Sequence, residues 1–145
     1  MHFTLVFPVV AVPSELEPEI TAVAQSTQPI SFTIRGTRVV RDALGNGSHI
    51  FLVPDEGGAQ IATLHDRLYA GALRAHRRSD IPFVPHMTVG AVPDSQLAER
   101  LAEELGVGSR MVRGMVANME LVDVGAPRVR SITSYALGNA AGTSD

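Results

Sequence analysis

Short runs of Val, Ile, Phe and Thr alternate along the 145-residue chain with segments richer in Ala, Glu and Leu. Branched and aromatic side chains pack well on a pleated surface, so the first kind of run predicts β-strands. The expected strands cover residues 3–10, 30–40, 49–53, 84–91, 111–124 and 129–137. The connection 42–47 contains Asn46-Gly47 and is typical of a hairpin.

The segments between these strands carry apolar residues at helical spacing, which predicts amphipathic helices. One helix is expected from Ser14, a capping residue after Pro13, and another from Asp94 after Pro93. A further helix covers residues 59–76. The apolar positions that share a helix face are Leu16, Ile20 and Val23, then Ile61, Leu64, Leu68 and Ala72, then Leu97, Leu101 and Leu105.

The element order, strand-helix-strand-strand, occurs once on each side of the helix at 59–76 and suggests an internal duplication. His2-Phe3-Thr4-Leu5 aligns with His86-Met87-Thr88-Val89, and Val12-Pro13 aligns with Val92-Pro93 ahead of each outer helix. The spacing from each of these His residues to the next strand of its repeat also agrees between the two copies.

We therefore expect an α+β fold with two pseudo-symmetric lobes and a central cleft, within a single bilobal domain over residues 1–138. Each lobe is expected to be a small, mostly antiparallel sheet backed by helices. Lobe 1 covers about 1–56, a linking helix about 59–77, and lobe 2 about 82–138. The small and polar residues 139–145 are expected to form a flexible tail.

The composition excludes several classes of site. The chain has no Cys, which excludes disulfide scaffolds, thiolate metal sites and cysteine nucleophiles. Its net charge of −3 argues against binding long duplex nucleic acid, because that requires a broad basic surface. The apolar run at 3–13 lacks a basic flank and contains Pro8, and no run has membrane-spanning length, so we expect a soluble cytoplasmic protein without a signal peptide or membrane partner.

Each repeat begins with a His-X-Thr motif inside an expected strand. Strand side chains alternate between faces, so His and Thr of one motif share a face. If the two strands lie near the pseudo-twofold axis, His2, Thr4, His86 and Thr88 line one cleft. Paired imidazoles can serve as acid and base in phosphoryl displacement, while hydroxyls donate to the non-bridging oxygens, and no metal or cofactor is needed. On the residues alone, ordinary sheet positions remain an open alternative for both motifs.

At these motifs the chain resembles the 2H phosphoesterase superfamily, which includes 2′-5′ RNA ligase-like proteins and cyclic phosphodiesterases. Its signature is a pair of His-X-(Thr/Ser) motifs in two lobes, and the run from Pro82 through Val89 resembles the second motif closely. The resemblance implies a metal-independent phosphoesterase for a small nucleotide or RNA-end phosphodiester, either a 2′,3′-cyclic phosphate or a 2′,5′ linkage. It implies His2 and His86 as the catalytic pair and Thr4 and Thr88 as phosphate-binding residues.

The first motif departs from the family pattern. Members usually carry a strand and a helix before it, whereas His2 directly follows Met1. This departure leaves an alternative open: a non-catalytic module that binds nucleotides or RNA ends and has a degenerate first lobe. A repeat protein used only for subunit contacts is a further alternative, and it predicts that both His-X-Thr faces are buried.

Other residues are weaker candidates. Phe7 and Phe83 flank the motifs and are candidate substrate contacts that could stack on a base or ribose, with core packing as the alternative. His49 could join His2 and His86 in a three-imidazole metal site, but the second repeat has no counterpart to it. We therefore favour a site without metal.

The remaining His and Arg residues have ordinary interpretations. His65 and His76 are expected to be solvated or partly buried helix residues. Arg35, Arg38 and Arg41 alternate between strand faces, so they cannot all reach one cleft; Arg38 or Arg41 could guide a nucleotide, with a solvated edge as the favoured role. Basic residues cluster before the second motif at Arg74, Arg77 and Arg78, and the segment Arg77-Arg78-Ser79-Asp80 is expected in a loop at the cleft mouth.

Overall fold

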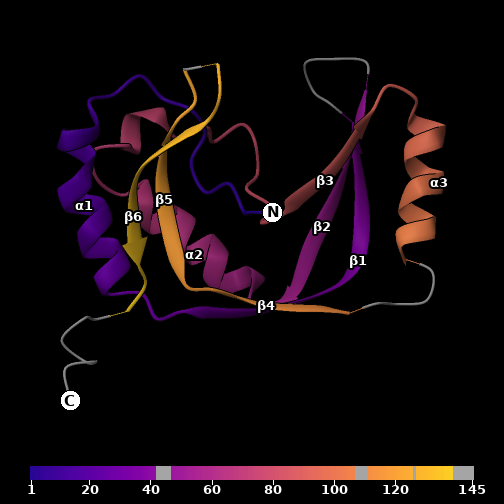
Figure 1. Cartoon of the computed structure of the whole chain (residues 1–145), viewed down its shortest axis with the longest axis horizontal. Helices are drawn as coiled ribbons and strands as arrows, with labels where there is room; N and C mark the ends of the chain where they lie inside the picture. Colours follow the sequence, from indigo (N-terminus) through magenta and orange to yellow (C-terminus); the bar gives the residue numbers. More distant parts are fainter. Residues whose placement is uncertain (42–46, 107–110, 126, 139–145) are drawn as a thin grey trace. The chain divides into compact units, whose positions relative to one another are not determined.

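The structure of the chain, a computed structural model, describes residues 1–41, 47–106, 111–125 and 127–138. Its helices are α1 (Pro13–Gln25), α2 (Gly58–Leu68), the short 3₁₀ helix η1 (Arg74–His76) and α3 (Ser95–Gly106) (Figure 1). Its strands are β1 (Ile30–Arg41), β2 (Ser48–Glu56), β3 (Met87–Val92), β4 (Val112–Val116), β5 (Asn118–Asp123) and β6 (Arg130–Ala136).

The strands form two separate sheets. The larger sheet has the order β3-β2-β1-β4, and the smaller one pairs β5 with β6. The β1–β2, β2–β3 and β5–β6 pairs are all antiparallel. The expected α+β class with small, mostly antiparallel sheets and supporting helices is therefore confirmed.

Residue contacts divide the chain into two compact units. Unit 1 contains Met1–Thr4, Ser31–Ala59 and Phe83–Gly114. Unit 2 contains Leu5–Ile30, Gln60–Pro82 and Met115–Asp145. Each unit draws on both expected lobes, so this division does not follow the two halves of the chain. The two-lobe symmetry stays a prediction.

In unit 1, α3 covers one face of the larger sheet. Ile50 of β2 is buried against Ala98 and Ala102 of α3, and the Thr37 hydroxyl of β1 donates a hydrogen bond to the Ala102 carbonyl at 3.0 Å. Since side chains alternate along a strand, the neighbours of Ile50 in β2, His49 and Phe51, point to the opposite face. The face opposite α3 therefore carries His49 and Phe51.

The helix α3 begins as the sequence predicts but buries a different stripe. The Asp94 carboxylate accepts a hydrogen bond from the Gln96 N–H at 2.9 Å, which caps the first turn. The expected apolar positions Leu97 and Leu105 are exposed, and Ala98 is fully buried instead. A small side chain lets the helix approach the sheet closely, so packing distance outweighs hydrophobicity at this position.

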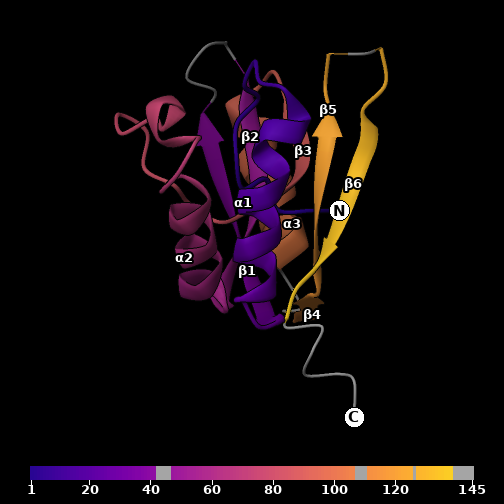
Figure 2. The ribbon, with the colours of Figure 1, turned by 90° about the vertical axis from the view of Figure 1, so that its left-hand side faces the viewer.

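In unit 2, α1 packs on the smaller sheet and lies next to α2 (Figure 2). Leu16 of α1 is buried against Tyr69 and Leu73, which follow α2. The end of α1 is tied to α2 by Arg67, whose guanidinium donates a hydrogen bond to the Thr27 hydroxyl at 2.6 Å and another to the Ser26 hydroxyl. Apolar packing and charge-assisted hydrogen bonds together hold this helix pair.

The expected strand at 3–10 is wrong. The structure assigns neither helix nor strand to residues 1–12. Pro8 has no N–H to donate to a ladder, and the Phe7 N–H donates to the Tyr69 hydroxyl at 3.2 Å rather than to a neighbouring strand. At Phe7 the backbone donor of this segment is thus satisfied by a side chain instead of a strand edge.

Other element boundaries also differ from the expectation. The expected strand at 111–124 divides at Ala117 into β4 and β5, which belong to different sheets. The helix expected over 59–76 ends at Leu68, and the Ala72 N–H beyond it donates to the Glu19 carboxylate at 2.8 Å. The expected strand at 84–91 begins only at Met87, because Pro82 and Pro85 supply no backbone donors.

Two further details complete the comparison with the sequence. α1 begins at Pro13, with Val12 in the capping position, so the cap expected at Ser14 is wrong. The connection 42–46 and the tail 139–145 lie outside the described residues, although Arg41 pairs with Ser48 at the base of that connection. Within the described ranges, the helices are too short and too polar to cross a membrane.

Candidate functional site

His86, the His of the second motif, is held by two contacts. Its Nδ1 lies 2.6 Å from the Val84 carbonyl oxygen, and its ring stacks on that of Phe51 with centroids 3.7 Å apart and planes at 20°. A carbonyl can only accept, so this hydrogen bond requires the proton on Nδ1. The Nε2 atom is then left to exchange a proton with a bound ligand.

The local sequence explains this arrangement. A residue before proline is pushed into an extended conformation, which applies to Val84 before Pro85. His86 follows Pro85 and directly precedes β3, so it lies at the entrance of a strand rather than within it. Its side chain is half-buried.

A β-bulge places Thr88 on the sheet face of Phe51, the ring that stacks on this imidazole. Ile50 pairs with Gly90, and without an irregularity the next pair would join Phe51 to Val89; instead Phe51 pairs with Thr88. Directly opposed residues share a sheet face, so Thr88 is on the face of Phe51. Bulges of this kind redirect side chains at functional sites. His86 and Thr88 are thereby assembled around one aromatic ring.

In the first motif, exposed and half-buried side chains alternate although the segment is not a strand. His2 and Thr4 are exposed, whereas Phe3 and Leu5 are half-buried. The Phe3 ring packs edge-to-face against Phe32 of β1, with centroids 5.2 Å apart and planes at 87°. Phe32 therefore anchors the residue between the two polar side chains.

Gly114 of β4 makes room for this anchor. A Cβ atom at position 114 would lie 2.5 Å from the Phe32 ring, closer than real Cβ contacts permit. Glycine is thus required for the close approach of β4 to Phe32, and through Phe32 for the placement of Phe3.

Both motifs belong to unit 1, and in the view of Figure 1 the N-terminus is drawn next to the first residues of β3. Within the described ranges no hydrogen bond or ring contact joins His2 or Thr4 directly to the second motif. The four predicted residues thus share one unit, and each motif has its own aromatic support: Phe32 for the first and Phe51 for the second.

Residues that the sequence did not single out as a group extend this face. Arg38 of β1 is the direct partner of Phe51 and is exposed. His49 lies on the same face of β2, with its ring centroid 6.0 Å from that of Phe51 and the two ring planes at 17°. Across the part of the chain that the structure describes, there is no group of three His, Asp or Glu side chains able to hold a metal ion, so the His49 metal site gains no support.

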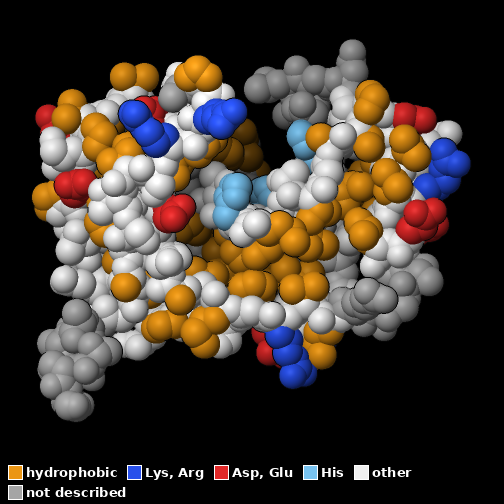
Figure 3. All heavy atoms as spheres, in the orientation of Figure 1, with side chains coloured by type: hydrophobic (Ala, Val, Ile, Leu, Met, Phe, Trp, Pro, Cys, Tyr) orange, Lys and Arg blue, Asp and Glu red, His pale blue; other side chains and the backbone are white. Residues whose placement is uncertain are grey.

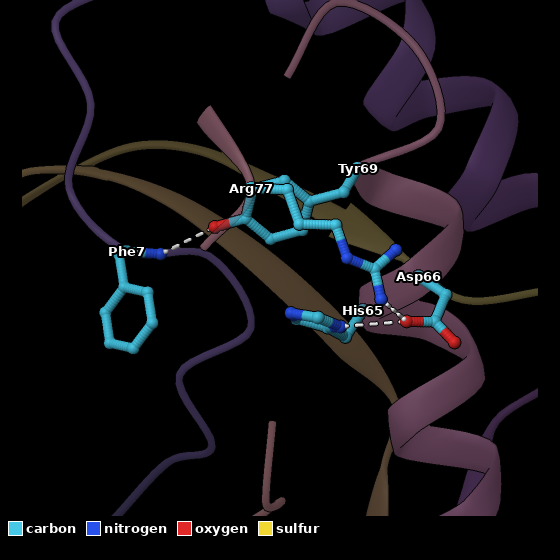
Figure 4. A network of polar contacts seen from close by, with 5 residues as sticks. All are labelled: Phe7, His65, Asp66, Tyr69 and Arg77. Atoms are coloured by element: carbon cyan, nitrogen blue, oxygen red, sulfur yellow. Dashed lines mark hydrogen bonds and ion pairs between the residues drawn. The ribbon is translucent and has the colours of Figure 1, made fainter. Parts of the chain in front are cut away.

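The two flanking Phe residues belong to different units. Phe83 is half-buried in unit 1, whereas Phe7 is in unit 2 with half of its side chain exposed. Figure 4 shows the Phe7 backbone N–H pointing to the Tyr69 hydroxyl. Their role as substrate contacts stays a prediction.

Figure 4 shows a polar network next to Phe7 that contains His65 and Arg77, two residues for which the sequence favours ordinary roles. His65 is buried, with 7% exposure, and its Nδ1 lies 3.2 Å from the Asp66 carboxylate. Arg77 donates to the same oxygen at 2.7 Å. The hydrogen bond from His65, followed by that from Arg77, holds the pKa of Asp66 below its usual value. His65 and Arg77 are thus structural partners of one exposed carboxylate.

Other charged residues form local pairs on the surface of their own units. Arg78 bonds Asp80 at 2.8 Å, and Arg35 lies 3.5 Å from the carboxylates of Asp55 and Glu56. The face in Figure 3 carries scattered basic and acidic side chains, with histidine side chains visible among them. This face presents no continuous basic area of the kind that long nucleic acids require.

Comparisons with known proteins agree with the resemblance found in the motifs. The family model of the 2′-5′ RNA ligase superfamily matches residues 1–126. A solved structure described as a phosphoesterase is similar to this chain with a TM-score of 0.54 and 18% identity, covering 94% of this chain and 77% of that one. No curated protein matches the sequence.

Proposed function

The chain belongs to the 2′-5′ RNA ligase superfamily, and from that premise we propose that it is a metal-independent phosphoesterase for a small nucleotide or RNA-end phosphodiester. The substrate bond is a 2′,3′-cyclic phosphate or a 2′,5′ linkage. The observation that carries this proposal is the state of His86: Nδ1 is bound to the Val84 carbonyl, and Nε2 is left for proton transfer beside Thr88. A cytoplasmic location is part of the same proposal.

The proposed reaction divides proton transfer between His2 and His86. One neutral imidazole takes a proton from the attacking water as its oxygen bonds to phosphorus, and the other, protonated, gives a proton to the oxygen that leaves. Thr4 and Thr88 donate hydrogen bonds to the non-bridging oxygens, where negative charge builds up. The oxygen of the water forms the new bond to phosphorus, the bond from phosphorus to the sugar oxygen breaks, and the sugar oxygen leaves as a hydroxyl. The two imidazoles have then exchanged protonation states at unchanged total charge. A proton passed from one to the other through solvent restores the starting state.

The charge of the protein supports a small substrate. A net charge of −3 with locally paired arginines gives little attraction for an extended polyanion. A single phosphodiester needs only a few placed donors, which the two His-X-Thr motifs supply.

A non-catalytic module that binds nucleotides or RNA ends is the second candidate. The observation that favours it is the exposure of His2: its neighbour Phe3 packs on Phe32, whereas among the described residues no hydrogen bond, ion pair or ring contact holds His2 itself. Such a module keeps Thr88 and His86 as ligand contacts but lacks a second proton-transfer group.

We expect turnover of at least one substrate among 2′,3′-cyclic nucleotides, 2′,5′-linked dinucleotides and ADP-ribose 1″,2″-cyclic phosphate, undiminished by EDTA. The rate should follow a bell-shaped pH profile, because one imidazole must be neutral and the other protonated. Product release is followed by chromatography, with a His86→Ala preparation as the control for contaminating phosphodiesterases. Loss of activity in EDTA that added metal restores, or no turnover of any of these substrates, would contradict the proposal.

A further inference from the structure

Phe51 stacks on His86 of the second motif and is paired with Thr88 of the same motif across the strands. Its ring lies on the His86 imidazole at a centroid distance of 3.7 Å, and its backbone pairs with Thr88 across the strands. We propose that Phe51 is a positioning residue for His86, which fixes the plane of the imidazole for proton transfer. This inference rests on the proposed function and concerns the same site.

The position of His86 explains why such support is needed. The recorded β2–β3 pairs end at Leu52 with Met87, so the backbone ladder stops one residue short of His86. The hydrogen bond from Nδ1 to the Val84 carbonyl sets one direction of the ring but leaves its tilt unconstrained. A parallel ring at van der Waals distance removes that tilt, and the two contacts together define where Nε2 points.

Phe51 is itself on a rigid support. Its strand β2 lies between β1 and β3, so it is hydrogen-bonded on both sides. The preceding residue, Ile50, is buried against α3. The His49 ring, two positions earlier on the same face of β2, lies nearly parallel to the Phe51 ring with centroids 6.0 Å apart. A site group held by residues that are themselves locked keeps its geometry best.

The test compares Phe51→Leu with Phe51→Tyr. Loss of the ring should lower kcat about 10- to 100-fold with KM changed less than about threefold, since misplacing a catalytic group by about 1 Å can cost 10²-fold. The Tyr variant keeps the ring face and should retain kcat within about threefold. Equal losses in both variants, or a change confined to KM, would overturn the positioning role.

A spectroscopic measurement on the full chain tests the stack apart from turnover. In the wild-type protein the His86 ring protons should be shifted upfield by the Phe51 ring, and Phe51→Tyr should preserve this shift. In Phe51→Leu they should move to the position of the exposed His76. A His86 resonance unaffected by Phe51→Leu contradicts the stack. If the His86 ring protons of the wild-type protein show the upfield shift but the protein is inactive, the stack is present and the proposed function is contradicted.

The strand register carries a second inference, on Arg38. Arg38 pairs with Phe51 on β1 while Thr88 pairs with it on β3, so the three residues form one row across the sheet on the same face. Two strand spacings separate Arg38 from Thr88, about 10 Å at the backbone. Arg38 is exposed, and within the described ranges it has no ion pair, in contrast to Arg35.

We infer that Arg38 binds a second phosphate group of the substrate, next to the phosphodiester held at Thr88. A guanidinium donates to phosphate oxygens in a bidentate manner, which suits it to this task. The inference rests on the proposed function and narrows its substrate class. The preferred substrates are nucleotides that carry a 5′-phosphate in addition to the reacting phosphodiester, rather than nucleoside 2′,3′-cyclic phosphates alone.

A matched control is available on the same strand. Arg41 pairs with the buried Ser48, so it lies on the face of α3, opposite Arg38. Arg38→Gln should raise KM at least about tenfold for a 2′,3′-cyclic nucleotide with a 5′-phosphate and less than about twofold for the one without it, because a charged hydrogen bond is lost. Arg41→Gln removes the same charge and should leave both KM values within about twofold.

The outcomes separate the two proposals. Equal effects of Arg38→Gln and Arg41→Gln would indicate general charge attraction and overturn the specific role of Arg38. Equal KM changes for both substrates in Arg38→Gln would overturn the second phosphate site. If the wild-type protein turns over no substrate of the screen, the proposed function fails; calorimetric binding of the 5′-phosphorylated compound, weakened only by Arg38→Gln, would then still support the phosphate site.

Discussion

Replacing His86 with alanine should lower kcat for phosphodiester hydrolysis by about 10²- to 10⁴-fold, the range that one acid-base group contributes. The Val84 carbonyl accepts a hydrogen bond from the His86 imidazole, and Nε2 of that ring is the proton-transfer atom of the proposed site. The effect should fall on kcat more than on KM, because Thr88, the proposed phosphate ligand, is unchanged. Initial rates on the best substrate of the screen measure it.

His76 offers a matched control for this substitution. It is exposed at the end of η1, so His76→Ala removes the same chemical group at a position outside the proposed site. That variant should keep kcat within about twofold. Thermal unfolding of both variants checks that they are folded, since His86→Ala also removes the ring stacked on Phe51. Full activity of His86→Ala on every substrate that the wild-type protein cleaves would contradict the assignment.

The sequence predicts those parts of the fold that depend on local signals. The cap at Asp94 and the apolar stripes of α1 and α2 come from residues within a few positions of each other, and the structure contains them. The strands β1, β2 and β6 lie within about two residues of their expected bounds, apart from a longer C-terminal end in β2. Such features follow from spacing, because helix and strand periods are fixed by backbone geometry.

The strand expected at 3–10 could not be judged from local signals. Its residues alternate as a strand requires, and the alternation survives as exposed His2 and Thr4 beside half-buried Phe3 and Leu5. Strand formation also needs a neighbouring backbone edge, and the recorded partner of Phe7 is a hydroxyl group of Tyr69, far away in the sequence. Non-local pairing of this kind leaves no mark in a short window.

The grouping of Phe51 with His86 depends on a β-bulge that the sequence does not predict. An unbroken β2–β3 register would set Phe51 opposite Val89, on the wrong face for Thr88. The extra residue in β3 puts Thr88 opposite Phe51 in place of Val89, since a shift of one position moves a side chain to the other face. The sequence motif identifies His86 and Thr88 as candidates. Phe51 and Arg38 are recognised as their neighbours only from the pairing of β1, β2 and β3.

The two motifs are supported in different ways, and this bears on what each contributes. His86 is itself in contact with an aromatic ring, whereas at the first motif the contact is made by Phe3, next to His2. A group held directly keeps its orientation before ligand binds, while one held through its neighbour gains orientation from the ligand. The first motif therefore decides between an enzyme and a binding module.

Replacing His2 with alanine should lower kcat by about 10²- to 10⁴-fold as well, because a pair of proton-transfer groups with one member missing has no second partner for the proton. Product binding should change by less than about threefold, since the proposed phosphate ligands Thr4 and Thr88 are unchanged. Turnover is measured on the best substrate and binding by calorimetry with the product nucleotide. His2 is exposed, so the substitution should leave the free energy of unfolding within about 0.5 kcal/mol.

The possible results assign the chain to one of the two classes. Loss of turnover with intact product binding in both His2→Ala and His86→Ala establishes a paired mechanism. Turnover that persists at the wild-type rate in His2→Ala removes His2 from the reaction and leaves His86 to act with another group. A wild-type protein that binds the product nucleotide but cleaves no phosphodiester of the screen is the binding module, in which the exposed first motif has lost its chemical role while the bulge of β3 still presents Thr88 to the phosphate.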